Sequence, residues 1–228
     1  MTMRELYELR GADPELLFSP YCWRVRLALH HKDLAFVSRP LRFSDKQPLL
    51  ACSGQQLVPV LCDGEAVVHD SLAIFQYLDL SYPERPLLGS GVALERARLV
   101  ERLVFQAVRM PLLKILLPRV FALIDPADRE YFRSSREKAL GTTLEAFADP
   151  AAGTEQFRVA IAPLQTWLSE QPYLDGAEPG GSDYLVAGLF LWAWCLGEQP
   201  WAAGTAVDGW FQRILATYQA QHGPVKRA

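Results

Sequence analysis

Two spacings of hydrophobic residues alternate along the first third of the chain. Segments 6–9 and 35–38 are short and apolar, which predicts strands. Between them, segment 20–31 carries apolar residues three or four positions apart, which predicts a helix with one buried face. A shorter and weaker helical pattern covers 45–51. We therefore expect two strands in this region, each followed by a helix.

A hairpin and a third helix follow. Segments 58–61 and 66–68 predict strands, and the dipeptide Asp63-Gly64 between them is a turn signal, so these two strands should run antiparallel. Segment 71–82 returns to helical spacing. The resulting order, βαβαββα, predicts a small mixed sheet flanked by helices, which is an α/β domain over 1–82.

The rest of the chain shows only helical patterns. A stretch rich in proline and glycine, 83–91, is predicted to be a linker, and 92–228 is predicted to be an all-α domain. Pro111 and Pro118 are expected to kink or end the first helix of that domain. The helices expected there cover 92–117, 126–147, 154–170, 183–196 and 207–221.

The helix predicted at 183–196 is apolar almost all round, so it should lie buried at the centre of the helical domain. Its start offers two capping arrangements. Asp183 suits the third position of a helix capped at Gly180, and Ser182 suits a direct cap. Both roles are structural.

Composition narrows the class of protein. The chain has 228 residues, of which 50% are hydrophobic and 21% charged, as in ordinary globular proteins with a core. The net charge is −3 and the Lys and Arg residues are scattered, so no nucleic-acid partner is expected. No apolar run approaches the roughly 18 residues of a membrane span, and no apolar leader follows the N-terminus. We expect a cytoplasmic protein without a membrane partner.

The four cysteines, at 22, 52, 62 and 195, do not have the paired spacing of metal ligands. The chain also has only four histidines. No metal site is therefore expected, and free thiols in a reducing compartment are the simplest interpretation.

Ser19 lies where a loop delivers the chain to the helix predicted at 20–31, with Pro20 in a favoured first-turn position. Unpaired amides and the positive end of the helix dipole favour an anion at such a place. A hydroxyl there is suited to hold a thiolate or an oxyanion. The alternative is that Ser19 only caps the helix.

Two further pairs of residues suggest a ligand site. Val58-Pro59 puts a proline in a strand-like run, where proline belongs at an edge or a turn, and a cis bond there would be a position-specific device. Asp70-Ser71 begins the next helix. Its carboxylate suits an ammonium group, and the helix N-terminus suits a carboxylate, so the pair fits an α-amino acid end. A plain helix cap is the alternative.

The motif Ser-Pro-Tyr-Cys at 19–22 occupies the place of the Cys-x-x-Cys motif in a thioredoxin-like domain, with serine in the exposed first position. Cys22 would then point inward as a packing residue. With Val58-Pro59, Asp70-Ser71, the Tyr-Pro-rich linker and the helical second domain, the chain resembles the cytosolic glutathione transferase superfamily over essentially its whole length. The Ser-Pro-Tyr-x-Trp-Arg opening, segment 128–137 and segment 183–192 are similar to bacterial β-aryl-etherase-type members.

The resemblance implies a fold and a set of roles. The fold is a thioredoxin-like α/β N-terminal domain followed by an all-α domain. Ser19 would be the catalytic residue and would donate a hydrogen bond to the sulfur of glutathione. Val58, ahead of an expected cis-Pro59, would pair through its backbone with the cysteinyl unit.

The remaining contacts to glutathione follow from the same resemblance. Asp70 and Ser71 would hold the γ-glutamyl end, with Asp70 in place of the commoner and longer Glu. Gln56 is a weaker candidate for the glycyl end, because the loop before Val58 departs from the usual Asn-Pro-x-Gly pattern. Gly180 stands where Ser or Thr is usual, which costs at most about 0.5 kcal/mol of helix capping.

A hydrophobic electrophile would lie between the two domains in this family. Each candidate for the walls of its site could equally be ordinary core or surface: Tyr21, Arg109, Met110, Lys114 and Trp192. The resemblance also implies a detoxifying transferase that works as a cytoplasmic homodimer, with glutathione as co-substrate and no metal. The electrophile itself, and whether the reaction is conjugation or ether cleavage, stay open.

Two other functions remain open. A redox thioltransferase would use Cys22 as its nucleophile, although a serine at position 19 argues against that chemistry. The protein could also be a non-catalytic binding or regulatory member of the same fold.

Overall fold

The computed structural model describes residues 3–228, which form a small sheet-containing domain and a larger helical one. The sheet has four strands in the order β2-β1-β3-β4. β1 and β2 are parallel, whereas β3 runs antiparallel to both β1 and β4. The mixed sheet and the antiparallel hairpin are thus confirmed. The bounds are β1 Arg4–Leu9, α1 Pro20–His31, β2 Phe36–Leu41, α2 Gln47–Ser53, β3 Val60–Asp63, β4 Ala66–His69 and α3 Ser71–Ser81.

One correction in this domain concerns the third strand. Val58 and Pro59 lie just before β3 instead of within it, because the ladder between β1 and β3 begins at Val60. The hairpin turn is Gly64-Glu65, one residue later than predicted, and Gly64 takes the positive φ of +63° that the turn requires.

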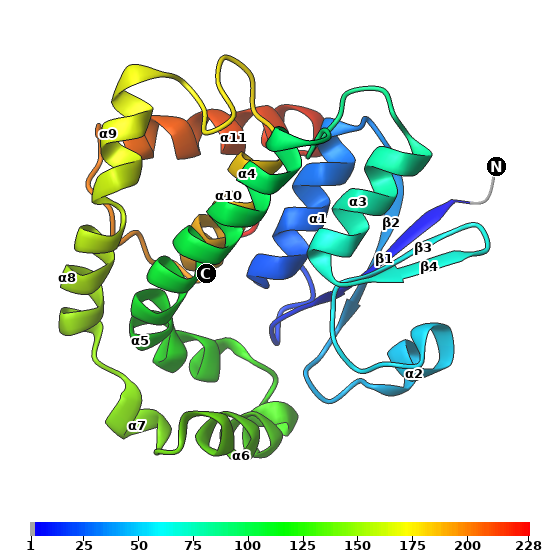
Figure 1. The fold of residues 1–228 in the computed structure, drawn as a ribbon. Helices are drawn as coiled ribbons and strands as arrows, with labels where there is room; N and C mark the ends of the chain where they lie inside the picture. The colour runs from blue at the N-terminus through cyan, green and yellow to red at the C-terminus, as the bar shows by residue number, and fades with distance from the viewer. Residues whose placement is uncertain (1–2) are drawn as a thin grey trace.

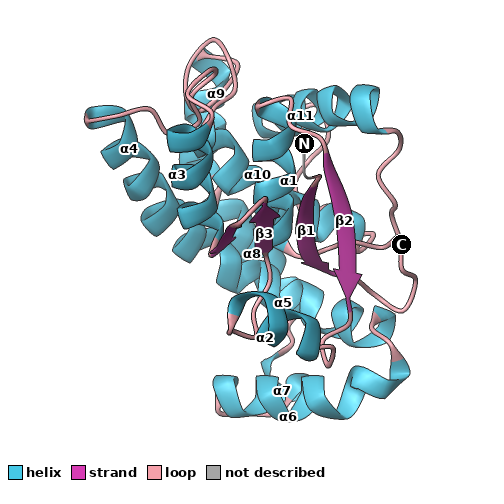
Figure 2. Cartoon of the chain, turned by 90° about the vertical axis from the view of Figure 1, so that its right-hand side faces the viewer, coloured by secondary structure: helices cyan, strands magenta, loops and turns pink. Residues whose placement is uncertain are grey.

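The helices α1 and α3 lie between the sheet and the helical domain (Figure 1). Figure 2 looks onto the sheet and shows α1 and α10 behind it. Residues of the core such as Leu6 on β1, Val25 on α1 and Phe75 on α3 are fully buried. The helices therefore cover the inner face of the sheet and carry the contact with the second domain.

The second domain is all helical, as predicted. It is built around α10, which is buried almost along its whole length. The bounds are α4 Val92–Val100, a π-helical turn Glu101–Phe105, α5 Gln106–Leu123, a 3₁₀ turn Pro126–Asp128, α6 Arg129–Leu140, α7 Leu144–Phe147, α8 Pro150–Ala160, α9 Ala162–Glu170, α10 Gly181–Cys195 and α11 Ala206–His222.

Three predictions of helix ends were wrong. Neither Pro111 nor Pro118 ends α5, which continues to Leu123 because the helix packs closely on α8: a Cβ on Gly153 would lie 2.9 Å from the Pro111 carbonyl oxygen. The helix predicted over 126–147 breaks at Gly141, whose φ is +69°. The helix predicted over 154–170 is two helices, and Pro163 lies in the first turn of the second.

The start of α10 follows the first of the two capping arrangements. Gly180 is the N-cap, and the Asp183 carboxylate accepts hydrogen bonds from the Gly180 amide at 3.0 Å, the Leu174 amide at 2.7 Å and Trp210 Nε1 at 2.8 Å. Burial raises the pKa of Asp183 to about 6, in spite of these donors. The carboxylate thus joins the loop before α10 to α11.

Close contact between α1 and α10 joins the two domains. A Cβ on Gly188 would lie 2.3 Å from the Pro20 carbonyl oxygen, so only glycine allows this approach. The contact fixes the first turn of α1 against the buried centre of the helical domain.

Candidate functional site

Ser19 occupies the turn at which the chain enters α1. Its backbone is extended, with φ −66° and ψ 123°, and its Oγ accepts a hydrogen bond from the Cys22 amide at 3.3 Å. Ser19 is therefore the N-cap of α1. Because an accepting hydroxyl oxygen keeps its own hydrogen, this cap leaves the Ser19 O–H able to donate to a ligand. The two interpretations of Ser19 are compatible.

Cys22 lies in the first turn of α1 and is buried. Burial and the nearby charge of Glu8 raise the pKa of its thiol to about 12. At neutral pH the thiol is protonated, and a protonated thiol is a poor nucleophile. The burial of Cys22 agrees with its prediction as a packing residue.

The sheet register brings three segments to one edge. Tyr7 near the end of β1 pairs with Val60 at the start of β3, and Val60 pairs with His69 at the end of β4. The loop into α1, the peptide before β3 and the turn after β4 therefore meet at the same edge of the sheet. These three segments carry the residues that the sequence analysis selected for glutathione.

The peptide bond between Val58 and Pro59 is cis, as expected. Val58 is partly exposed, whereas Pro59 is buried. Among residues 3–228, neither the amide nor the carbonyl of Val58 has a hydrogen-bond partner. The Val58 backbone is thus available to pair with an extended ligand.

Asp70 and Ser71 begin α3. Asp70 has a φ of +72°, which is unusual for a residue with a side chain, and its Oδ1 accepts hydrogen bonds from the amides of Leu72 at 2.9 Å and Ala73 at 3.1 Å. The Asp70 side chain therefore caps α3, and its Oδ2 accepts no hydrogen bond within residues 3–228. Ser71 is buried, and its Oγ accepts a hydrogen bond from Arg24 Nη1 at 3.3 Å.

Gln56 lies exposed in the loop before the cis peptide. Its carbonyl oxygen accepts a hydrogen bond from Lys46 Nζ at 3.1 Å. Burial lowers the pKa of Lys46, as does the nearby Arg136, and Nζ lies 5.7 Å from the centre of the Tyr131 ring. The sequence analysis did not select Lys46, because this residue is part of no recognisable motif.

The residues predicted to contact an electrophile do not all come together. Tyr21 is 38% exposed, and its ring centre lies 5.5 Å from that of Phe105, over which the Arg109 guanidinium lies at 5.7 Å. Lys114 is on another side of α5, where its Cβ lies 3.1 Å from a Cβ built on Gly153 of α8. The structure thus groups Tyr21 and Arg109 through Phe105 and places Lys114 in the contact with α8.

The two other predicted contacts are less exposed. Met110 is partly buried. Trp192 is only 8% exposed and lies one helical turn beyond Gly188, on the face of α10 that meets the start of α1. Arg136 on α6, which sequence reasoning did not select, is partly buried, and this burial lowers the pKa of its guanidinium.

Arg24 and Glu101 were also missed. Arg24 is fully buried, and its Nη1 donates to Glu101 Oε1 at 2.8 Å as well as to Ser71. The only signal in the sequence is a charged residue within the buried stretch of α1. The partner on the π-helical turn is 77 positions away in the chain, so pattern analysis could not identify it.

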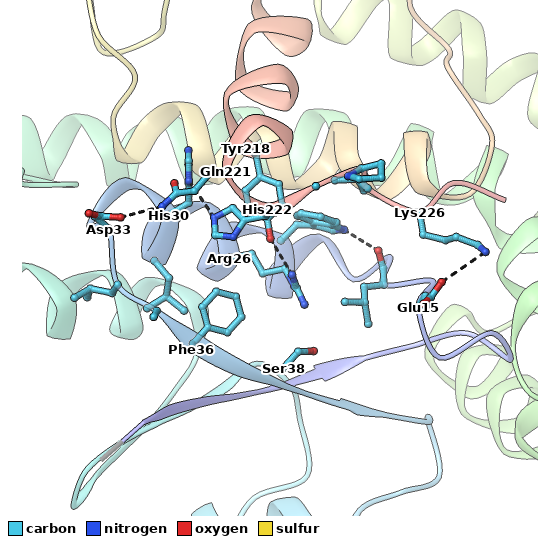
Figure 3. A pocket seen from close by; sticks show the side chains of 18 residues that line it. Glu15, Arg26, His30, Asp33, Phe36, Ser38, Tyr218, Gln221, His222 and Lys226 are labelled. Atoms are coloured by element: carbon cyan, nitrogen blue, oxygen red, sulfur yellow. Dashed lines mark hydrogen bonds and ion pairs between the residues drawn. The ribbon is translucent and has the colours of Figure 1, made fainter. Parts of the chain in front are cut away.

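A cavity of about 470 Å³ lies apart from these residues, between α1, β2, α11 and the C-terminal tail. Figure 3 shows Arg26, Tyr218, His30 and His222 along its wall. Its polar groups satisfy one another: Arg26 Nη1 donates to the Tyr218 hydroxyl at 2.8 Å, and His30 Nδ1 and His222 Nε2 are 3.2 Å apart. A second cavity, of about 590 Å³, borders the linker. Ser19, Val58 and Asp70 line neither cavity.

Residues 3–228 contain no group of three His, Cys, Asp or Glu side chains arranged to hold a metal ion. Within the same residues, no helix has the length and apolar character that a membrane crossing requires.

Family models match both parts of the chain. Residues 14–86 match the glutathione S-transferase N-terminal domain, and residues 93–220 match the glutathione S-transferase C-terminal domain. A curated relative, the glutathione S-transferase-like protein ustS of Aspergillus flavus, is 23% identical over 209 residues, which are 78% of this chain and 75% of the relative. A probable maleylacetoacetate isomerase of Vibrio cholerae is 37% identical over 76 residues, 31% of this chain and 35% of the relative.

Solved structures share the fold. Glutathione transferase GSTFuA3 of Phanerochaete chrysosporium superposes with a TM-score of 0.84 and 24% identity, covering 96% of this chain and 98% of that one. The glutathione S-transferase CsGST63524 of Ceriporiopsis subvermispora, solved in complex with glutathione, gives 0.82 and 23% over 96% and 97% of the two chains.

Proposed function

Because the chain belongs to the glutathione S-transferase family, we propose that it binds glutathione where α1, the cis peptide and α3 meet, and that it activates the thiol for attack on a hydrophobic electrophile. The observation that carries this proposal is the convergence of Ser19, Val58 and Asp70 at one edge of the sheet. Together they offer a hydroxyl, an unpaired backbone and a carboxylate to one peptide-like ligand.

Ser19 is the proposed catalytic residue. Lowering a thiol pKa from about 8.5 to about 6.5 requires roughly 2.7 kcal/mol of preference for the thiolate. One hydrogen bond to a charged group contributes about 1.5–3 kcal/mol, and the helix dipole about 0.3–1 kcal/mol. These two terms suffice, so Ser19 donates a hydrogen bond without ionising, and the glutathione sulfur is the nucleophile.

The rest of glutathione would lie along the same edge. The Val58 backbone pairs with the cysteinyl unit, and Pro59 shapes that loop. Asp70 Oδ2 accepts from the γ-glutamyl ammonium, while the Ser71 hydroxyl donates to its carboxylate. For the glycyl carboxylate, the cation of Lys46 is a better chemical match than the amide of Gln56, whose side chain makes no hydrogen bond within the part of the chain that the structure describes.

The electrophile would approach the sulfur over Tyr21. Phe105 and Arg109 extend that aromatic surface, and Met110 and Trp192 lie on the adjoining helices. In the reaction, the sulfur forms a bond to carbon as the bond from that carbon to a halide or an ether oxygen breaks, and the departing group takes the electron pair. Conjugation and ether cleavage both follow this course.

A homodimer is the proposed assembly. Leu99 and Leu103 lie one turn apart on α4 and the π-helical turn, and they are 56% and 62% exposed. Adjacent exposed leucines are more readily explained by a partner surface than by solvent. A reducing, cytoplasmic location and a role in detoxification are proposed with it, and all four cysteines are unpaired.

Three measurements test the proposal. Isothermal titration with glutathione distinguishes a glutathione-binding enzyme from a non-catalytic member that has lost this ligand, and a conjugation assay with a chlorodinitrobenzene-type electrophile tests activity. Thiolate absorbance against pH then reports the bound thiol. Ser19→Ala should raise the pKa of that thiol by about 1–2 units.

Cys22→Ser is the matched control, because Cys22 lies one turn away and is buried. It should leave the bound thiol and the conjugation rate unchanged. An unchanged titration in Ser19→Ala would refute the role of Ser19, whereas loss of activity in Cys22→Ser would favour thioltransferase chemistry.

A further inference from the structure

One of the four cysteines, Cys62, lies on the face of the sheet that α1 and α3 do not cover. The register pairs Cys62 of β3 with Glu5 of β1 and with Val67 of β4. Its neighbour Leu61 is fully buried in the main core, and side chains alternate along a strand, so Cys62 points to the opposite face. The helix α2 contacts β4 and lies apart from α1 and α3 (Figure 1).

Cys52 approaches Cys62 from α2. Leu49 is 1% exposed yet lies outside the main core, so α2 buries one of its faces against the sheet. Cys52 follows Leu49 by three positions and shares that face. Burial, the charge of Cys52 and a hydrogen bond with Cys52 raise the pKa of Cys62 to about 11. Because a bond that raises the pKa of a thiol favours its protonated form, Cys62 is the donor and the Cys52 sulfur accepts.

The same two cysteines are the ones that solvent can reach. Cys52 and Cys62 are partly exposed, whereas Cys22 and Cys195 are buried. Burial raises the pKa of Cys195 to about 12, as it does for Cys22, and a buried protonated thiol is inert. Cys62 also keeps its proton near neutral pH while Cys52 is free. The arrangement therefore suits Cys52 to react first.

We propose that Cys52 and Cys62 form a redox-active pair, which a small disulfide such as glutathione disulfide oxidises reversibly. The Cys52 thiolate attacks one sulfur of the reagent and forms a mixed disulfide, and the departing thiolate takes the electron pair. Cys62, released from the charge of Cys52, then loses its proton and attacks Cys52 Sγ, which expels the second thiolate. The two departing thiolates take up the two protons. Two protein thiols thus become one disulfide, and one small disulfide becomes two thiols.

The disulfide would close a ring over residues 52–62, which contains Gln56, Val58 and the cis peptide. Without it α2 is held weakly: among its residues 47–53 only Leu49 is buried, and Lys46 provides no side-chain cap. A cross-link would fix α2 and both ends of the loop that follows. The redox state of the pair therefore sets how freely this loop moves. The importance of that motion for a ligand rests on the proposed function, whereas the chemistry of the pair does not.

Mass spectrometry after incubation with glutathione disulfide tests the pair. The wild-type protein should lose two hydrogen atoms. Chymotrypsin, which cleaves after leucine, should cut at the exposed Leu57 and leave the two halves joined until dithiothreitol is added. Hydroxyethyl disulfide should oxidise the pair in the same way, so the result does not depend on binding of glutathione.

Variants separate the two steps. Cys62→Ser should stop at the mixed disulfide and gain one glutathionyl group. Cys52→Ser should react at least about tenfold more slowly, because the remaining thiol is mostly protonated. Cys22→Ser removes a buried thiol, is the matched control and should behave as the wild-type protein. A wild-type protein that does not react, or that keeps the mixed disulfide, refutes the pair.

Hydrogen exchange tests the consequence for the loop. Amides of α2 and of residues 54–58 should exchange at least about tenfold more slowly in the oxidised protein. Those of α7, another short helix, should not change. A disulfide that leaves the exchange of α2 unaltered refutes the link to the loop. If the protein oxidises as expected but binds no glutathione, the proposed function fails and the redox pair stands.

Discussion

Arg24 and Arg26 are two residues apart on α1 and face opposite sides of the helix. Arg24 faces α3 and the helical domain with one partly exposed counter-ion. Arg26 faces the sheet and α11, where Glu8 accepts two hydrogen bonds from it, at 2.6 and 2.7 Å. Burial alone would lower the pKa of Arg26, but the charge and hydrogen bonds of Glu8 raise it above its usual value.

The difference separates two uses of a buried cation. The pair of Arg26 and Glu8 is closed, with Ser38 and Tyr218 completing its hydrogen bonds, so it has little left to offer a ligand. The environment of Arg24 is open, because Nη2 has no hydrogen-bond partner within residues 3–228. Burial by itself therefore does not distinguish the two arginines, whereas the hydrogen-bond partners of each guanidinium do.

The largest effect is expected from a variant that breaks the closed pair of Arg26 and Glu8. Arg26→Gln leaves the fully buried Glu8 carboxylate without its counter-ion, and it should lower the free energy of unfolding by about 3–5 kcal/mol in a denaturant titration. Arg39→Gln, which breaks the exposed pair of Arg39 with Glu5, is the matched control and should cost about 1 kcal/mol or less. Equal losses in the two variants would contradict the special contribution of the buried pair to stability.

A middle-sized effect concerns the glycine that faces Arg24. Gly188→Ala puts a Cβ 2.3 Å from the Pro20 carbonyl oxygen and 2.9 Å from Arg24 Cγ, so it should cost about 1–3 kcal/mol of unfolding free energy and weaken glutathione binding. Gly209→Ala in α11 meets only the flexible end of Arg213 at 3.4 Å and should stabilise the helix by up to about 1 kcal/mol. A Gly188→Ala protein as stable as Gly209→Ala would contradict the close contact.

The smallest effect is a pH dependence on the Arg26 side of α1. Burial lowers the pKa of both His30 and His222, and the nearby Arg26 adds to the effect on His222. The unfolded chain therefore binds more protons as the pH falls below about 6.5, so these histidines stabilise the fold above that pH and lose their contribution below it. Solvent screens the exposed His222, so its share of the decline stays below the limit of about 1.4 kcal/mol per pH unit that any one titrating group sets.

Thermal or denaturant unfolding between pH 7 and 5 measures this effect. His222→Gln should flatten the decline in stability on acidification. His69→Gln, on the exposed end of β4, is the control and should follow the wild-type curve. If the stability of His222→Gln also follows the wild-type curve between pH 7 and 5, the His30–His222 pair does not contribute to the pH dependence of stability.

Local signals account for the parts of the fold that the sequence predicted. The cap at Ser19 and the proline after it define the start of α1, and the hairpin follows from a two-residue turn with glycine. The break at Gly141 was also readable, since a glycine followed by Thr143, the N-cap of α7, marks the end of one helix and the start of another. The continuation of α5 through two prolines was not, because packing on α8 outweighs their local preference.

The candidate site divides in the same way. Ser19, Val58 and Asp70 follow motifs of fixed order in the chain, so the sequence analysis could select them. Lys46 and the link from Arg24 to Glu101 depend on how loops and domains pack, which no local spacing encodes. Lys114 was selected from helical position alone, and the rotation of α5 turns it toward α8.

The junction at Arg24 also limits how this protein can be recombined. A chimera joined within 83–91 would take Arg24 and Ser71 from one parent and Glu101 and Leu185 from the other. A foreign helical half with an apolar residue at position 101 would leave the guanidinium with no counter-ion. Exchange of the second half therefore has to keep an acidic residue at the π-helical turn.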